Sequence, residues 1–249
     1  KGHLSYTGGG AGVWSAGGSL ITGVYQARAT GLQNAAIKWG GYDGSSNQCA
    51  IELYDGSTWS AGGSGTDQPR TGVDTGTGTQ NAVVAFTTGS LEFNGTVWTV
   101  GLDFGTDHGP KPGTTGTQNA AIAFGGGYNT PGAKCHTSHY NGTSFTLGGN
   151  MNIARGYAAY FGEADNAAIV VGGDPDTDVS SEVLRTTGNE EYNGVSWKQI
   201  SAIITGRFGS MGFGTVNAGA VAGKYPSNAS TEEWNGSAWS VGGNLGTGR

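Results

Sequence analysis

The 249-residue sequence contains few charged residues, little proline and no long hydrophobic run. Charged residues make up 12% of the chain, about half the usual share, and the formal net charge is −6. Nucleic-acid-binding proteins usually present a basic face, so this balance argues against nucleic acid as a partner. No stretch of about 18 apolar residues occurs, so we expect no helix to insert into a membrane.

Only two cysteines are present, Cys49 and Cys135. Each lies ten residues before an aromatic residue of the same repeated motif, Trp59 and Phe145. Equivalent positions in units two apart are too distant for a disulfide, which needs Cα atoms within about 7 Å. We therefore expect both cysteines to be small buried core residues.

The periodicity of an amphipathic helix is also missing. No window of a dozen residues keeps an apolar face at helical spacing without several glycines, so the chain is predicted to be all-β. Glycine is abundant, with 50 residues, but it is periodic, and 35% of the chain is hydrophobic. Closely spaced strands with tight turns fit this composition better than disorder does.

One motif recurs along the whole chain: an aromatic residue, Asn-Gly or Asp-Gly, two small or apolar residues and then Trp or Phe. The copies are Asp55-Gly56 before Trp59, Asn94-Gly95 before Trp98, Asn141-Gly142 before Phe145, Asn193-Gly194 before Trp197, and Asn235-Gly236 before Trp239. A degraded copy surrounds Trp14, and the aromatic anchors recur on average every 45 residues. Such a period is typical of a repeat architecture.

Each repeat is predicted to contain four short strands, which we name A to D. Strand B follows an Asn-Ala pair and is apolar on both faces, which indicates burial on both sides. The pairs are Asn34-Ala35, Asn81-Ala82, Asn119-Ala120, Asn166-Ala167 and Asn217-Ala218. A glycine three residues earlier suits a tight A–B hairpin, but Glu163 stands there in one copy. Strand C carries carboxylates, and strand D carries the Trp.

Four-stranded units of this length predict a β-propeller that forms a single domain over residues 1–249. Five Asn-Ala hairpins but six aromatic anchors are present. Five blades with an extra strand pair is the simplest count, and a six-bladed ring that lacks one A–B pair is the rival. In either case the strands around Tyr6–Trp14 can complete a blade begun by C-terminal strands. The chain starts at Lys1 and stops at Arg249 within a repeat, so we expect a processed or partial product.

The order of Gly172-Gly173, Glu190-Glu191-Tyr192-Asn193-Gly194 and Trp197 resembles the kelch repeat, whose family fold is a β-propeller. Thr87-Thr88 and Phe145 depart from that pattern. The amino-acid pattern of residues 231–245, 117–126 and 143–155 also resembles that of kelch-like repeat proteins of marine tailed bacteriophages. That resemblance implies a virion or host-recognition protein, located in a virion or outside the cell.

Three carboxylates, Asp174, Asp176 and Asp178, stand at alternate positions in the longest B–C loop and are the candidate metal ligands. Carboxylate oxygens suit calcium, the one cofactor that we consider. The EF-hand pattern fails, because Val179 and Arg185 stand where Gly and Glu are required. An exposed polar loop without metal is the alternative.

Periodic residues are better explained as scaffold than as a site. The tryptophans of strand D are expected to form the core between blades rather than a sugar-stacking platform. A set of basic residues, Arg28, Arg70, Lys111, Arg155, Arg207 and Arg249, is expected to pair with carboxylates or cap carbonyl groups rather than form a cationic ring. Lys38 stands where other repeats have Ala or Val, and we expect it to reach the central channel or a rim.

No nucleophile elbow, phosphate loop or catalytic carboxylate pair is visible, so we expect a non-enzymatic protein. The first hypothesis is a structural or receptor-binding component of a virus particle that docks to virion proteins, a host receptor or a glycan. The variable loops Asp103–Lys111, Tyr128–Lys134 and Asp174–Val179 are its expected binding surfaces. The alternative is a secreted or cell-surface carbohydrate-binding module. An enzyme with a site in the central channel is the third hypothesis.

Overall fold

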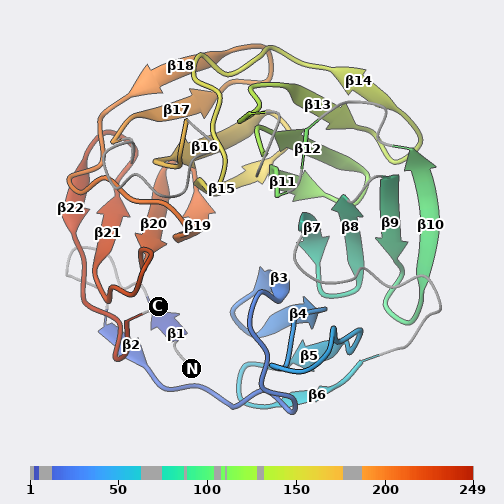
Figure 1. Ribbon diagram of the computed structural model, residues 1–249. Coiled ribbons are helices and arrows are strands. Elements are labelled where there is room, and N and C mark those ends of the chain that lie inside the picture. Colours follow the sequence, from blue (N-terminus) through green and yellow to red (C-terminus); the bar gives the residue numbers. More distant parts are fainter. Residues whose placement is uncertain are drawn as a thin grey trace.

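The structure, a computed structural model, describes residues 3–5, 13–62, 75–86, 89–103, 108–109, 111–127, 132–175 and 187–248. All secondary-structure elements among these residues are β-strands. The strands form five four-stranded sheets. These sheets are arranged around a central axis (Figure 1). The predicted all-β propeller is therefore confirmed.

Each blade is an antiparallel meander, with strand A nearest the axis and strand D at the rim (Figure 1). Blade I contains β3 (Arg28–Leu32), β4 (Ala35–Trp39), β5 (Glu52–Tyr54) and β6 (Trp59–Ala61). Blade II contains β7 (Thr75–Thr79), β8 (Ala82–Phe86), β9 (Gly89–Phe93) and β10 (Trp98–Asp103). Blade III contains β11 (Gly113–Thr117), β12 (Ala120–Phe124), β13 (Thr137–Tyr140) and β14 (Phe145–Leu147).

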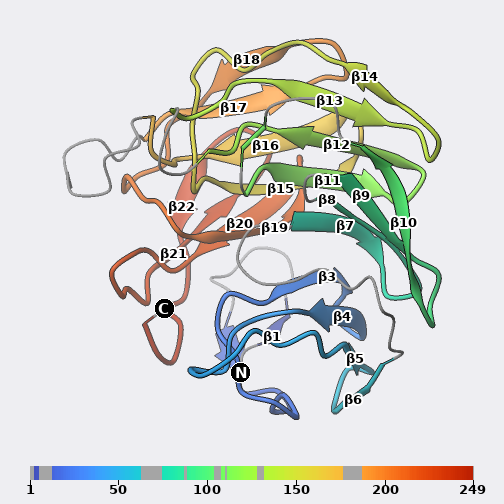
Figure 2. The same ribbon diagram turned by 45° about the vertical axis from the view of Figure 1, so that its right-hand side comes forward.

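Two further blades complete the set of four-stranded sheets. Blade IV contains β15 (Ala159–Ala164), β16 (Ala167–Val171), β17 (Asn189–Tyr192) and β18 (Trp197–Ile200). Blade V contains β19 (Met211–Thr215), β20 (Ala218–Ala222), β21 (Thr231–Trp234) and β22 (Trp239–Val241). In the turned view of Figure 2 the strands of each blade lie side by side.

A separate two-stranded sheet pairs β1 (His3–Ser5) with β2 (Val13–Ser15). Figure 1 places it between blade V and blade I. Leu4 is paired with Trp14, just as Tyr54 is paired with Trp59 at the end of strand C in blade I. The described residues therefore contain five four-stranded blades and one separate strand pair, as the simplest count predicts.

The A–B hairpins need glycine for a steric reason. Gly116 has φ +107°, and a Cβ there would lie 2.2 Å from the carbonyl oxygen of Ala120. In blade IV, where Glu163 breaks the sequence pattern, the register shifts between Phe161 and Ala164. This bulge moves Gly162, with φ +152°, into the strained place and leaves Glu163 outside it.

The C–D hairpins are stabilised by the predicted turn chemistry. In blade III the Oδ1 atom of Asn141 accepts hydrogen bonds from the backbone N–H groups of Thr143 (2.9 Å) and Ser144 (2.8 Å). Gly142 has φ +87°, a conformation that glycine adopts at little cost. The Asn-Gly and Asp-Gly pairs are therefore turn residues, as the sequence predicts.

Aromatic residues of strand D form the contacts between blades. Trp98 packs on Trp39 of the preceding blade with ring centroids 5.7 Å apart, and Trp197 packs on Phe124 at 4.8 Å. Trp98, Trp197 and Trp239 are buried, with at most 9% exposure. The core assignment is confirmed for these three residues and for Trp39, while Trp59 is only half-buried.

Hydrogen bonds also join some A–B hairpins to strands B and C of the preceding blade. Gln80 in the A–B hairpin of blade II donates from Nε2 to the carbonyl oxygens of Ala36 and Tyr54 in blade I, both at 2.9 Å. Gln118 in blade III makes the equivalent pair of bonds to blade II. Gln33 holds this position in blade I, but it is exposed and has no hydrogen-bond partner among the described residues.

The two cysteines are free thiols. Cys135 is half-buried against the core between blades III and IV, in agreement with the expected core role. Cys49 is exposed in the B–C loop of blade I, so the prediction that it is buried is wrong. The loop following β4 places this residue outside the sheet, and the position ten residues before the anchor is therefore not equivalent in the two blades.

The difference between Gln80 and Gln33 gives a stability test. We expect Gln80→Ala to lower the free energy of unfolding by about 1–3 kcal/mol, because two carbonyl oxygens between blades lose their donor. Gln33→Ala is the matched control and should change it by less than about 0.5 kcal/mol. Urea unfolding followed by tryptophan fluorescence measures both values, and equal losses for the two variants would contradict the assignment.

Candidate functional site

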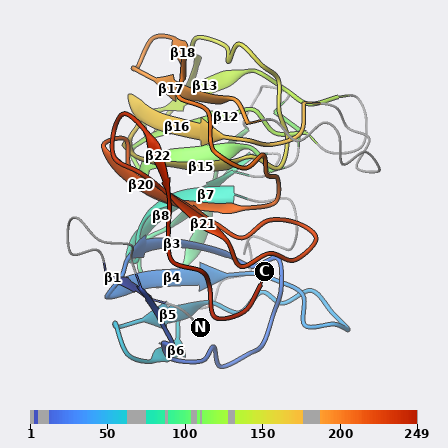
Figure 3. The ribbon, with the colours of Figure 1, turned by 90° about the vertical axis from the view of Figure 1, so that its left-hand side faces the viewer.

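The B–C loops and the D–A linkers lie together at one end of the blades, which we call the loop face. Their described parts are residues 40–51, 125–127, 132–136, 172–175, 187–188 and 223–230 of the B–C loops and residues 16–27, 148–158 and 201–210 of the linkers. In Figure 3 several of these loops project on the right-hand side. Loops on a rigid scaffold commonly carry binding residues, so this face contains the candidate site.

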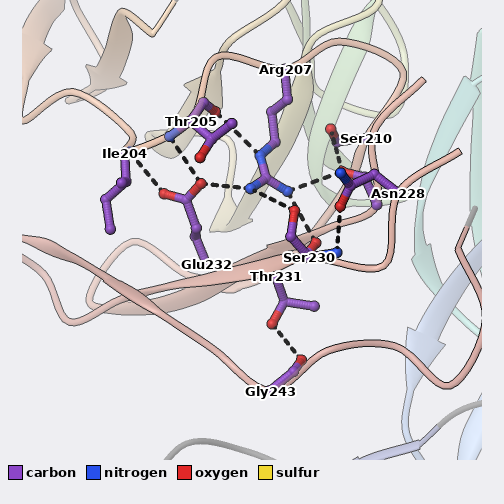
Figure 4. Close-up of polar contacts among 10 residues, drawn as sticks. Ile204, Thr205, Arg207, Ser210, Asn228, Ser230, Thr231, Glu232 and Gly243 are labelled. Carbon is purple, nitrogen blue, oxygen red and sulfur yellow. Dashed lines mark hydrogen bonds and ion pairs between the residues drawn. The ribbon is translucent and has the colours of Figure 1, made fainter. Parts of the chain in front are cut away.

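A buried carboxylate on strand C holds each of three linkers. Glu232 accepts hydrogen bonds from the backbone N–H groups of Ile204 (2.8 Å) and Thr205 (3.1 Å), as Figure 4 shows. Glu190 binds the linker before blade IV in the same way, through Asn152 and Ile153. Glu52 binds Ile21 and Thr22 before blade I.

Arg207 completes this arrangement in blade V. Its Nη2 atom lies 2.5 Å from Oε1 of Glu232, and its Nη1 atom donates to the carbonyl oxygens of Gly223 (3.0 Å) and Ser230 (3.2 Å) (Figure 4). Arg207 is 1% exposed, so its charge is desolvated and needs these partners. The guanidinium fork thereby joins the linker, strand C and the B–C loop of one blade.

Arg155 repeats the arrangement in blade IV. It pairs with Glu190 at 2.8 Å and donates to the carbonyl oxygens of Gly172 and Gly188. Burial lowers the pKa of Arg155, and the charge of Glu190 opposes that shift. Arg155 and Arg207 therefore pair with carboxylates and cap carbonyl groups, as the sequence analysis expects.

Blade I makes the same contact with residues from different positions. Val24 stands three residues after Ile21, where blades IV and V have arginine. The cation is supplied instead by Lys38 of β4, whose Nζ atom lies 3.4 Å from Glu52 and 3.5 Å from the carbonyl oxygen of Ala50. Lys38 is 2% exposed, so the expectation that it reaches the channel or a rim is wrong.

Blade III replaces the ion pair with a hydrogen bond between a histidine and a serine. His108 is 1% exposed, and its Nε2 atom is hydrogen-bonded to Oγ of Ser138 at 2.9 Å. Ser138 holds the strand C position of Glu190, and the Nδ1 atom of His108 lies 3.4 Å from the carbonyl oxygen of Gly125. His108 is therefore a structural residue of this blade, in addition to its place in a loop.

The other basic residues do not share one environment. Arg28 begins β3 and is not the equivalent of Arg155, while Arg70 and Arg249 lie outside the described residues. Lys111 lies over the ring of Tyr157, with Nζ 4.8 Å from its centroid. Burial lowers the pKa of Lys111, and the charge of Arg28 adds to that effect.

Two aromatic pairs occupy equivalent positions on the loop face of blades I and V. Tyr25 and Tyr42 are joined by two backbone hydrogen bonds, and their rings lie edge to face at 5.3 Å. Phe208 and Tyr225 are joined by the bond from Tyr225 N to Phe208 O, and their rings lie 5.2 Å apart. Tyr25 is 56% exposed and Tyr225 is 57% exposed, so each pair presents a ring to solvent.

The equivalent place in blade IV is occupied by Gly156 and Asp174, which exchange two backbone hydrogen bonds. Tyr157, the next residue, lies edge to face with Phe208 at 6.3 Å. The aromatic surface of blade V therefore continues through Tyr157 to Lys111. We call Lys111, Tyr157, Phe208 and Tyr225 the loop-face row.

Asp174 of the predicted calcium set belongs to this backbone bridge. It is buried, with 4% exposure, and it lies next to the loop-face row. Asp176 and Asp178 lie outside the described residues, so the calcium site stays a prediction. Among the described residues, no group of three or more His, Cys, Asp or Glu side chains is close enough to hold a metal ion.

A small cavity lies beneath the loop-face row. It is lined by Lys111, Tyr157 and Met151, among others, and has a volume of about 10 Å³. This is room for about one water molecule. A ligand of this face would therefore lie on the exposed rings rather than inside a pocket.

The chain matches no known family model and no curated protein. The described part of the chain holds no helix with the length and hydropathy of a membrane span.

Sequence reasoning missed the aromatic pairs, because it treated only the periodic tryptophans as candidates for stacking. A local signal exists: Tyr42 directly follows the Gly40-Gly41 pair, and Tyr225 lies two residues after Gly223. Their partners Tyr25 and Phe208 lie in linkers of unequal sequence. Only the backbone bridges show that the four residues form two equivalent pairs.

The buried carboxylates can be tested with two neighbouring residues. Glu190→Gln should lower the free energy of unfolding by about 3–5 kcal/mol, because Arg155 is left buried without its counter-ion. Glu191→Gln is the control, since its ion pair with Lys198 is solvent-exposed and worth about 0–1 kcal/mol. Urea unfolding at neutral pH compares the variants, and a loss below about 1 kcal/mol for Glu190→Gln would refute the structural role.

We expect the protein to lose stability in alkali, because the phenol of Tyr140 ionises there. Burial, together with the hydrogen bond to Glu92 and the charge of Glu92, raises its pKa from 10.0 to about 12. The folded state favours the neutral phenol, so its contribution is complete below the unfolded pKa and is lost as pH rises from about 10 to about 12. Unfolding midpoints across this range should fall less steeply for Tyr140→Phe, and an unchanged slope would be the contrary result.

Proposed function

We propose that this propeller is a non-enzymatic binding protein that acts as a structural or receptor-binding component of a bacteriophage particle. The loop face makes the contact, and the exposed rings of Tyr25 and Tyr225 are its anchors. The partner is a host-surface glycan or another component of the particle. The location that follows is a virion or the extracellular space.

The observation that carries the proposal is the pair of exposed aromatic sites. Tyr25 and Tyr225 are each more than half exposed, yet each is held by a second ring and by backbone hydrogen bonds. A ring fixed in this way loses little conformational entropy on binding. The tyrosine ring also joins an apolar face to a polar hydroxyl, which suits a partner with both kinds of surface.

The virus assignment is supported by the sequence resemblance to kelch-like repeat proteins of marine tailed bacteriophages. The resemblance is based on the repeated amino-acid pattern of residues 231–245, 117–126 and 143–155. The alternative is a secreted or cell-surface carbohydrate-binding module. The exposed aromatics favour glycan recognition in either setting, because sugar rings present apolar faces that stack on aromatic rings.

A glycan array with fluorescently labelled protein tests the binding surface. We expect at least one glycan class to bind, and Tyr225→Ala and Tyr25→Ala should weaken that binding by roughly tenfold or more. Val195→Ala is the matched control, because Val195 is 74% exposed but lies in a C–D turn at the opposite end of its blade. Equal binding by all three variants would exclude the aromatic pairs as the site.

Sedimentation of native source material through a density gradient, with mass-spectrometric detection of the chain, separates the two settings. A component of the particle travels with capsid protein and DNA. Recovery of the chain in the soluble fraction alone, together with glycan binding, would overturn the particle assignment and support the carbohydrate-binding module.

A further inference from the structure

The inner strands of the propeller form an incomplete ring. β3, β7, β11, β15 and β19 pack side by side in that order, but β19 and β3 form no comparable contact. Figure 1 shows β1 and β2 in this sector, displaced towards the rim. β1 pairs with β2 alone among the described strands, whereas every strand C of the five blades also pairs with a strand B.

The contact of β2 with blade V repeats the contact of blade V with blade IV. Trp239 donates from Nε1 to the carbonyl oxygen of Ser201, four residues after Trp197, at 3.2 Å. Trp14 donates from Nε1 to the carbonyl oxygen of Gly243, four residues after Trp239, at 3.1 Å. β2 therefore occupies the strand D position of the next blade.

The ring contacts of the two tryptophans repeat as well. Trp239 lies edge to face with Phe161 at 6.2 Å, and Trp14 lies edge to face with Phe213 at 5.7 Å. Phe161 pairs with Ile169 and Phe213 pairs with Ala220, which are the third residues of their B strands. Phe213 is therefore the equivalent of Phe161, one blade further round.

The segment that leads from β2 into blade I also follows the path of another D–A linker. A Cβ at Gly18 would lie 2.4 Å from the carbonyl oxygen of Ser57, and one at Gly149 would lie 2.2 Å from that of Val195. Both glycines follow strand D and pass close to the C–D turn of the next blade. Together with the tryptophan contacts, this places β1 and β2 as the outer half of a sixth blade.

The surfaces that border the inner half of this sector lack the contacts made elsewhere. Met211 in β19 is 70% exposed, whereas its equivalent Ala159 is 2% exposed. Gln33 has no hydrogen-bond partner among the described residues, although Gln80 and Gln118 each bind two carbonyl groups of the preceding blade.

Threonine bonds join the inner strands of blades I to IV, whereas Phe161 and Phe213 hold the threonine position in blades IV and V. Thr30 donates from Oγ1 to the carbonyl oxygen of Gly78, and Thr77 donates to that of Gly116. The equivalent carbonyl oxygen in blade I belongs to Gly31, and no described side chain donates to it. The sector is thus bordered by backbone and side-chain groups whose counterparts are paired in blades II and III.

We propose that this sector is a binding site for a β-hairpin with the chain's own A–B pattern, supplied by a polypeptide segment outside residues 1–249. The pattern is that of β11 and β12: a Gly-Thr strand, a Gln-Asn turn and a strand of small apolar residues. Strand B of the hairpin pairs with the free edge of β1, and its threonine donates to Gly31. Gln33 donates to the hairpin as Gln80 does to blade I.

The free edge of β1 decides in favour of a polypeptide. A strand edge presents alternating N–H and C=O groups, and an added strand satisfies them in register. In each of the five blades strand B of the hairpin pairs with strand C of the same blade, and strand A packs against the strand A of a neighbouring blade. The proposed interface therefore continues one that the fold repeats.

The test uses the full chain and a labelled synthetic peptide with the sequence of residues 111–126. We expect the peptide to bind, measured by fluorescence anisotropy, and to raise the melting temperature. Met211→Lys should weaken binding by roughly tenfold or more, because it places a charge against the hairpin. Val241→Lys is the matched control, since Val241 has 69% exposure in the same blade but lies at the rim.

Gln33→Ala is a second, milder variant. It should weaken peptide binding by a smaller factor and leave the stability of the free chain unchanged. Equal peptide affinity for wild type, Met211→Lys and Val241→Lys would overturn the proposal. A second result would also overturn the proposal: the peptide does not bind, and sedimentation shows a dimer that Met211→Lys dissociates. The sector would then bind a second folded copy of the chain. Neither result depends on glycan binding by the loop face.

Discussion

The buried carboxylate of strand C is the constraint on which the linkers of this propeller depend. Each linker must cross from the rim of one blade to the inner strand of the next, and its backbone N–H groups then have no sheet partner. Glu232 accepts two of these groups and holds Arg207, which in turn caps carbonyl groups of the B–C loop. One desolvated ion pair thereby fixes the linker, strand C and loop as a unit.

The way blades differ shows that the contact, rather than the residue, is retained. Lys38 reaches Glu52 from strand B when Val24 replaces the linker arginine, so the charge balance is kept from another direction. His108 and Ser138 keep the geometry with a hydrogen bond in place of the ion pair. An unpaired carboxylate or guanidinium at these depths would cost several kcal/mol, so blades I, IV and V, which keep the carboxylate, each supply a cation for it.

Much of the fold was predictable, since alternation, Asn-Gly turns and a 45-residue repeat all act locally or through a repeated core. The candidate sites were less predictable from the sequence. Arg28 shares a sequence neighbourhood with the other arginines but lies four residues beyond the equivalent place, and only the bonds of Ile21 and Thr22 to Glu52 reveal this. Tyr25 and Tyr42 meet through a backbone bridge that residue spacing does not encode. Such pairings are tertiary, so a single sequence cannot define them.

The two aromatic pairs and the incomplete sector involve the same two blades. Tyr25 and Tyr42 belong to blade I and Phe208 and Tyr225 to blade V, and these blades border the sector on either side. A hairpin seated there would contact both inner strands and restrict how the blades move relative to each other. If a ligand bridges the two exposed tyrosines and its binding is coupled to that of the hairpin, each must change the other's affinity by the same factor, because coupling between sites is reciprocal. A ligand that uses one pair alone would show no such coupling, so its presence or absence distinguishes a bridged site from two separate ones.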